Sequence, residues 1–146
     1  GISRICKTAP VGFGRQPAYL NAVLQLAPGL APGTLLRLVK RLERQAGRRL
    51  GRHWGPRPLD LDILDYGGRR FGWPPSAHRR GRLILPHPEM HRRAFVLIPL
   101  LELAPAWRHP ALGISGRTLL VRIGPKARAE VRATLDLMAL ACDKTG

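Results

Sequence analysis

Cysteines and long apolar runs are both scarce in this sequence. Two of its 146 residues are cysteines, and Cys6 and Cys142 are too far apart in the chain to suggest a metal-ligand spacing or a disulfide framework. No apolar run is long enough to cross a membrane, and the first residues do not have the pattern of a signal peptide. We therefore expect a protein of the reducing cytoplasm with no membrane partner.

Acidic residues are also few. The chain has 9 Asp and Glu against 25 Lys and Arg, which gives a formal net charge of +16. This excess predicts an anionic partner, either nucleic acid or a nucleoside triphosphate. The basic residues are mostly Arg and accompany much Ala, Gly, Pro and Leu, a compositional bias that weakens charge as evidence for function.

Common catalytic motifs are missing. There is no Walker-type Gly-x-x-x-x-Gly-Lys-Ser/Thr loop and no convincing Ser/His/Asp or Cys/His arrangement. His87 and His91 are spaced like two ligands of a zinc ion, but Pro88 disfavours a regular helix through both, and no Cys or third His has a matching spacing. If ATP binds this chain, side-chain cations and metal ions must hold its phosphates.

The length and the 45% hydrophobic content predict one globular domain over residues 1–146. The segment from Pro32 to Ala46 has apolar residues at helical spacing, with Lys40 on the opposite, basic face, which we expect to be solvated. Strands are predicted at 1–8, 19–27, 59–66, 83–85 and 118–123, and helical segments at 32–46, 90–93, 95–103 and 126–141. This mixture favours an α+β layered fold.

Two aspartates alternate with apolar residues in the predicted strand at 59–66. Asp60 and Asp62 would point to one side and Leu59, Leu61 and Ile63 to the other. Aspartate is poorly suited to strand interiors. The pair is either part of a solvated face or a pair of oxygen ligands for Mg²⁺.

Two groups of cations and one polar pair are further candidates. Guanidinium groups suit phosphate oxygens because they donate in pairs and keep their charge, although each one could equally be a surface arginine. The cations are Arg48, Arg49, Arg52 and Arg57 in one loop, and Arg82, His87, Arg92 and Arg93 further on. Tyr19 and Asn21 could hold a flat heterocycle, or be a packed Tyr and a turn Asn.

The segment from His53 to Leu64 (His-Trp-Gly-Pro-Arg-Pro-Leu-Asp-Leu-Asp-Ile-Leu) resembles the signature of the hydroxymethyl-dihydropterin pyrophosphokinases of folate biosynthesis. Further likenesses are the Thr-x-Pro-hydrophobic-Gly loop at 8–12, the Gln-Pro-x-aromatic-Leu-Asn-Ala segment at 16–22, and the residues Glu43, Pro86, His87, Arg93 and Phe95. The resemblance runs in order over residues 1–112, whereas 113–146 match poorly.

The resemblance implies a ferredoxin-like layered antiparallel sheet with helices, and transfer of pyrophosphate from ATP to 6-hydroxymethyl-7,8-dihydropterin. It implies two Mg²⁺ ions held by Asp60 and Asp62, with Arg48 and Arg57 clamping phosphate and Asp62 helping to deprotonate the hydroxyl. The implied nucleotide residues are Glu43, Trp54, Arg57, Ile63, Arg82, His87 and Arg93. The implied pterin residues are Thr8, Pro10, Val11, Tyr19, Asn21, Trp54 and Phe95.

The chain departs from the family pattern at its start, because family members begin with a strand, a Gly-Ser-Asn turn and a helix upstream of residue 1. We therefore expect an N-terminally incomplete domain whose sheet lacks an inner strand. In addition, His53 stands where the family usually has Arg, and Lys40 where a Gln is common near ATP.

Two other interpretations remain. One is a truncated homologue that catalyses nothing. The other is a basic nucleic-acid-binding module with Trp54, Phe71 and Trp73 as stacking platforms. The paired aspartates argue against the module, since carboxylates repel a phosphate backbone unless metal ions intervene. We expect a monomer.

Overall fold

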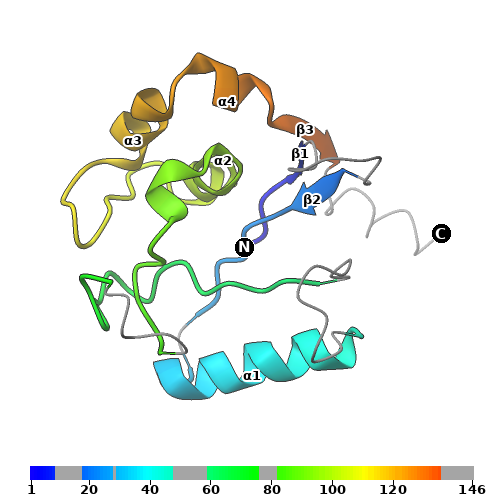
Figure 1. Ribbon diagram of the computed structural model, residues 1–146, viewed down its shortest axis with the longest axis vertical. Coiled ribbons are helices and arrows are strands. Elements are labelled where there is room, and N and C mark those ends of the chain that lie inside the picture. Colours follow the sequence, from blue (N-terminus) through cyan, green and yellow to red (C-terminus); the bar gives the residue numbers. More distant parts are fainter. Residues whose placement is uncertain (9–17, 28, 48–58, 76–81, 136–146) are drawn as a thin grey trace. The chain divides into compact units, whose positions relative to one another are not determined.

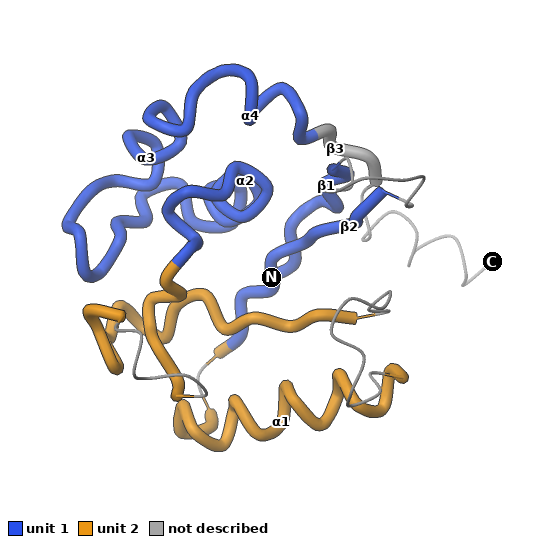
Figure 2. Tube along the Cα trace, in the orientation of Figure 1, with its two compact units in different colours: residues 1–26, 89–146 blue, residues 27–88 orange. Residues whose placement is uncertain are grey.

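A computed structural model describes residues 1–8, 18–27, 29–47, 59–75 and 82–135, the last four through their backbone. Pro10, Val11, Arg48, Trp54 and Arg57, which the sequence predicts as site residues, lie outside the described residues. Figure 2 shows two compact units, unit 1 with residues 1–26 and 89–146 and unit 2 with residues 27–88. The single domain stays a prediction.

Unit 1 contains an antiparallel sheet of three strands in the order β2-β1-β3 (Figure 1). The central strand β1 (Ile5–Thr8) pairs with β2 (Tyr19–Asn21) on one side and with β3 (Arg132–Leu135) on the other. An isolated bridge between Ile2 and Leu24 continues the β1–β2 pairing. The predicted α+β class and antiparallel sheet are therefore confirmed, and the strands predicted at 1–8 and 19–27 are present but shorter.

The described part of unit 1 also has four helical elements. They are the 3₁₀ helix η2 (Met90–Arg92), α2 (Ala94–Leu103), α3 (Gly116–Ile123) and α4 (Pro125–Ala129). Helix α2 is almost entirely apolar and contacts both β1 and α3. Its Val96, Leu97 and Leu100 are buried, together with Met90 and Leu119. The core of unit 1 is thus centred on α2.

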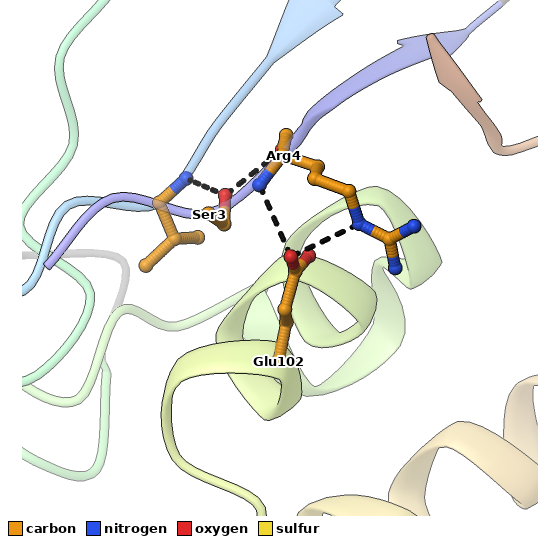
Figure 3. Close-up of polar contacts among 4 residues, drawn as sticks. Ser3, Arg4 and Glu102 are labelled. Carbon is orange, nitrogen blue, oxygen red and sulfur yellow. Dashed lines mark hydrogen bonds and ion pairs between the residues drawn. The ribbon is translucent and has the colours of Figure 1, made fainter. Parts of the chain in front are cut away.

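An ion pair ties the N-terminal segment of the chain to α2 (Figure 3). The Arg4 Nε donates to Oε1 of Glu102 at 3.0 Å, and the Arg4 backbone N–H points to the same oxygen at 3.4 Å. Next to it, the Ser3 hydroxyl accepts the Val23 N–H at 2.9 Å and donates to the Arg4 carbonyl at 3.0 Å. These bonds hold the chain before β1 against both α2 and the segment after β2.

Unit 2 contains one long helix, α1 (Pro32–Gln45), which confirms the helix predicted at 32–46. Pro32 occupies its first position, where a missing N–H costs no hydrogen bond. The remaining described chain of unit 2 is extended or turning. Tyr66 anchors it to the start of α1, because its hydroxyl donates to the Leu30 carbonyl at 2.7 Å.

The predicted strands at 59–66 and 83–85 are wrong within the residues that the structure describes. The backbone of 59–65 runs as an extended trace in Figure 1 but forms no strand; the His87 N–H donates to the Leu64 carbonyl at 2.8 Å. Leu85 makes an isolated bridge with Phe71. These segments therefore bond at single points, and a strand needs a continuous ladder of such bonds.

Two predictions near the C-terminal end are also wrong. The segment 118–123, predicted as a strand, lies in helix α3, because the Ser115 hydroxyl accepts the Thr118 N–H at 3.1 Å and caps the helix. The helix predicted at 126–141 is a short α4 followed by the strand β3; residues 136–141 lie outside the described residues. The helical turn at 90–93 and the helix at 95–103 are confirmed as η2 and α2.

No helix among the described residues combines the length and the apolar character that a membrane span requires.

Candidate functional site

The predicted alternation of exposure holds from Asp60 to Ile63, although this segment is not a strand. Leu59, which was predicted on the side of Leu61 and Ile63, is exposed. Asp60 and Asp62 are exposed, while Leu61 and Ile63 are half-buried. An extended backbone turns successive side chains to opposite sides, whether or not it is paired in a sheet. Both carboxylates are consequently accessible to a ligand.

Glu43 of α1 accepts a hydrogen bond from the backbone of this segment. It is the buried residue of the helix, with 1% of its surface exposed. Its Oε1 accepts the backbone N–H of Leu61 at 2.9 Å, and its Oε2 lies 3.0 Å from the ammonium nitrogen of Lys40. Leu61 is the residue between the two aspartates, so the helix is bonded to the middle of the candidate site.

The contacts of Glu43 also set its charge. Burial alone would raise the pKa of the carboxyl group, but the hydrogen bond from Leu61, the ammonium of Lys40 and a hydrogen bond with Asp60 together outweigh burial and lower the pKa below its ordinary value. Glu43 is therefore a buried carboxylate that its partners keep ionised at neutral pH.

A cavity of about 350 Å³ lies in unit 2 next to this segment. It has three basic side chains, one carboxylate and an apolar remainder. Its lining consists of Leu36, Lys40, Leu61, Asp62, Ile63, Arg82, Leu83, Ile84, His87 and Pro88. Apolar walls with a few convergent charges are typical of small-molecule sites, and the cations suit an anionic ligand with a flat apolar part.

The carboxylate and the imidazole in this cavity are close to each other. The His87 Nε2 lies 3.8 Å from Oδ2 of Asp62, too far for a direct hydrogen bond. His87 is also positioned through its backbone, since its N–H bonds to Leu64 in the same extended segment. The predicted nucleotide residues Ile63, Arg82 and His87 are thus brought together with the predicted metal ligand Asp62.

The two aspartates supply the number of carboxylates that a protein usually gives to Mg²⁺. The described residues contain no group of three or more His, Cys, Asp or Glu side chains that could hold a metal ion. Mg²⁺, however, usually takes one or two carboxylates and completes its shell with water and substrate phosphates. Two exposed carboxylates beside a cationic cavity fit such an ion.

In unit 1, three of the predicted pterin residues lie together on paired strands. Thr8 of β1 is directly opposite Tyr19 of β2. The Asn21 side-chain amide donates to the Thr8 hydroxyl at 3.1 Å. Tyr19 is exposed, and Asn21 and Thr8 are half-buried. The strand pairing therefore gathers an aromatic ring, an amide and a hydroxyl at one place.

Phe95 and Arg93 form a second group in unit 1. The guanidinium carbon of Arg93 lies 6.0 Å from the centroid of the Phe95 ring, at the limit of a cation–π contact. The Arg93 carbonyl accepts the N–H groups of Val96 and Leu97 and so starts helix α2. Arg93 and Phe95 therefore both lie at the start of α2.

A larger hollow of about 510 Å³ in unit 1 contains the candidate cation Arg92 but none of the residues that the family resemblance implies. It is lined by His91, Arg92, Leu112, Ile114, Leu119, Arg122, Ile123 and Ala127. Its size alone does not outweigh the chemistry of the smaller cavity, which combines Asp62 with three basic side chains.

Sequence reasoning missed two features of the cavity in unit 2. Lys40 was predicted on a solvated face but lines the cavity, and its place near the family's ATP position was the signal for this. The bond between Glu43 and the Leu61 backbone has no signal in the sequence, because a backbone N–H is present at nearly every residue.

Comparisons with known proteins identify the family of the chain. The family model described as 7,8-dihydro-6-hydroxymethylpterin-pyrophosphokinase (HPPK) matches residues 1–105. A 2-amino-4-hydroxy-6-hydroxymethyldihydropteridine pyrophosphokinase of Synechocystis sp. is 41% identical over 105 residues, which are 72% of this chain and 49% of the relative. The proteins of the same name from Haemophilus influenzae and Pseudomonas aeruginosa are 42% and 41% identical, over 70% and 75% of this chain and 59% and 63% of their own lengths.

The chain belongs to the HPPK family. It spans about half to less than two thirds of the length of these three relatives.

Proposed function

We propose that this chain transfers the pyrophosphoryl group of ATP to the hydroxymethyl oxygen of 6-hydroxymethyl-7,8-dihydropterin, giving AMP and the pterin diphosphate for folate biosynthesis. Its relatives carry the name of this activity. The observation that supports it in the structure is the unit 2 cavity, where Asp62 lies among Lys40, Arg82 and His87.

The cavity in unit 2 is proposed as the ATP site. Its apolar residues, among them Ile63, suit the adenine ring, and Arg82 and His87 suit the phosphates. Arg93, which lies in unit 1, stays a predicted nucleotide residue. ATP carries a high negative charge, and the chain's net charge of +16 favours its encounter.

Two Mg²⁺ ions are proposed at Asp60 and Asp62. When bound, such ions offset the charge of the phosphates during transfer. The two carboxylates supply hard oxygen ligands from one extended segment, and the pair needs only phosphate and water oxygens to complete the coordination. Trp54 and Glu43 are proposed on the nucleotide side of the site.

In the proposed reaction the pterin hydroxyl oxygen forms a bond to the β-phosphorus of ATP. The bond from that phosphorus to the oxygen it shares with the α-phosphate breaks, and AMP leaves with this oxygen. Asp62 helps to take the hydroxyl proton, and Arg48 and Arg57 bind the phosphate oxygens, whose charge grows during transfer.

The pterin site is proposed on the β1–β2 strand pair and on the residues Thr8, Pro10, Val11, Tyr19, Asn21, Trp54 and Phe95. A pterin is flat, with hydrogen-bonding groups along its edge. Tyr19 or Phe95 can stack on such a ring, and the Asn21 amide can read its edge. We also propose that the chain acts as a monomer in the cytoplasm.

Assay of AMP release from ATP and hydroxymethyl-dihydropterin, with and without Mg²⁺, tests the proposal. The Haemophilus influenzae relative serves as the positive control. AMP from the relative and none from this chain would overturn the proposal for this chain and leave the interpretation as an inactive homologue.

The double substitution Asp60→Asn and Asp62→Asn separates the enzyme from a nucleic-acid-binding module. It should abolish Mg²⁺-dependent transfer, whereas binding of single-stranded RNA should stay the same or strengthen because two negative charges are lost. Asp65→Asn is the matched control, since Asp65 lies in the same segment and its Oδ1 accepts the Gly68 N–H, a bond that Asn preserves. Activity that survives the double substitution would exclude the metal assignment.

A further inference from the structure

The buried carboxylate of Glu43 needs an explanation beyond helix formation. Glutamates of surface helices normally keep their carboxylates in water, because burying the charge is costly unless it is paired and hydrogen-bonded. Helix α1 instead buries this one residue and leaves Leu38 and Leu42 exposed at 40% and 42%. The cost of burial is offset by bonds to Leu61 and Lys40.

The bond to Leu61 replaces the bond that a neighbouring strand would otherwise supply. A backbone N–H in a half-buried position requires an acceptor. Residues 59–65 are extended but form no strand ladder, so the Leu61 N–H receives its acceptor from a side chain, at 2.9 Å. A hydrogen bond to an ionised acceptor is stronger than one between neutral groups.

We propose that Glu43 is a positioning residue, which holds the backbone at Leu61 and thereby sets the spacing and direction of the Asp60 and Asp62 carboxylates for their cations. This inference rests on the proposed function, because it assigns Glu43 a task toward the same metal ligands. Glu43 acts on Asp62 through the backbone and on Asp60 also through the hydrogen bond between the two side chains. Lys40 balances the charge of Glu43 from the preceding helical turn.

Two substitutions of Glu43 separate the effect of side-chain length from the effect of charge. Glu43→Gln keeps the length of the side chain and an acceptor oxygen for the Leu61 N–H but removes the charge. Glu43→Asp keeps the charge but shortens the side chain by one methylene group, which withdraws the acceptor from Leu61. A positioning role depends on the length of the side chain, whereas a direct electrostatic role toward nucleotide or metal depends on its charge.

The matched controls are Glu102→Gln and Glu102→Asp in α2. Glu102 is also a helical glutamate, and its Oε1 is likewise approached by a backbone N–H and a basic side chain, those of Arg4. It lies in unit 1, whereas the aspartate segment lies in unit 2. Any effect shared by both pairs of variants therefore reflects a general loss of a helix contact.

The experiment uses the full 146-residue chain and three readouts. Amide hydrogen exchange at Leu61, followed by NMR, reports on the bond itself. Mn²⁺ affinity, from the electron paramagnetic resonance signal of free Mn²⁺ in the presence of an α,β-methylene ATP analogue, reports on the metal site. Affinity for the analogue without metal reports on direct nucleotide contact, and thermal unfolding confirms that each variant is folded.

We expect Glu43→Asp to speed exchange at Leu61 and to weaken Mn²⁺ binding by about threefold to tenfold, the range for loss of one hydrogen bond. Glu43→Gln should change both by less, and it should not weaken metal-free analogue binding more than Glu43→Asp does. The Glu102 variants should leave Leu61 exchange and Mn²⁺ affinity unchanged.

Two results would overturn the inference. One is a larger loss of Mn²⁺ or nucleotide affinity in Glu43→Gln than in Glu43→Asp, which would assign the role to charge. The other is unchanged exchange and Mn²⁺ affinity in both variants. If the wild-type chain releases no AMP while Leu61 exchange and Mn²⁺ affinity change as expected in the variants, the positioning role stands and the proposed transfer fails. If the wild-type chain releases AMP while Leu61 exchange and Mn²⁺ affinity do not change in the variants, the proposed transfer stands and the positioning role fails.

Discussion

The Nε2 of His87 lies 3.8 Å from Oδ2 of Asp62, and both side chains line the same cavity in unit 2. The pair places a nitrogen donor beside a carboxylate that is free to face a cation. Such an arrangement can contact phosphate oxygens and a metal ion at neighbouring points.

Replacing His87 by Asn should weaken ATP binding. The cavity would lose one of its basic side chains, and we expect the Kd of an α,β-methylene ATP analogue with Mg²⁺ to rise about threefold to tenfold. Isothermal titration calorimetry measures this. His91→Asn is the matched control, because His91 lines the separate hollow in unit 1. Equal effects of the two substitutions would contradict the assignment of His87.

The ion pair between Arg4 and Glu102 should contribute little to stability. The two side chains are 58% and 31% exposed, so water screens their attraction. A double-mutant cycle with Arg4→Ala and Glu102→Ala, measured by urea unfolding, should give a coupling free energy of about 0.2–1 kcal/mol. A coupling of several kcal/mol would mean that the pair is far better shielded from water than its exposure indicates.

Cys6 should react slowly. Burial raises the pKa of its thiol, and the Glu102 carboxylate raises it further against the opposing effect of Arg4. The reactive thiolate is therefore disfavoured in the folded chain. Modification by iodoacetamide at pH 8, followed by peptide mass spectrometry, should be at least about tenfold slower in the folded chain than in guanidinium.

The raised pKa of the Cys6 thiol also predicts in which direction stability changes with pH. Because the folded chain binds the thiol proton more tightly than the unfolded chain, the contribution of Cys6 is fully present below the unfolded pKa of about 8.5 and is lost as the pH rises through the higher folded value. Cys6→Ala should flatten the fall of the unfolding midpoint above pH 8.5. An identical pH profile in this variant would show that other groups cause the fall.

Gly116 should not tolerate a methyl group. A Cβ at this position would lie 2.7 Å from Leu101 Cδ2 and 3.1 Å from Trp107 Cε3. We expect Gly116→Ala to lower the free energy of unfolding by about 1–3 kcal/mol through overpacking. Gly33→Ala in α1 is the control, since its Cβ would meet only the end of the Arg37 side chain at 3.9 Å; it should be neutral or stabilising by up to about 1 kcal/mol. A neutral Gly116→Ala would mean that Leu101 moves aside at no cost.

Helix α1 and the exposure of the aspartates could be predicted from the sequence, because both depend on local geometry. Pro32 suits the first helical position, and the apolar spacing through Leu42 repeats with the helical turn. Likewise an extended chain exposes Asp60 and Asp62 on one side whatever its partners are.

Segments with two plausible local structures were predicted wrongly. The residues Thr118-Leu-Leu-Val-Arg-Ile123 have strand-like composition, yet they form α3, because Ser115 caps the helix and Leu119 is buried. Strand β3 pairs with β1 from more than a hundred residues away in sequence, and no local pattern specifies such a partner.

The family, the α+β class and the residue types of the site follow from the amino-acid sequence, since these depend on composition, order and local periodicity. The folded chain was needed to show that 59–65 forms no strand ladder among the described residues, that Lys40 lines a cavity, and that Glu43 bonds to Leu61. A backbone N–H or a buried charge takes whichever partner the folded chain brings within about 3 Å, and that partner is chosen by the packing of distant segments.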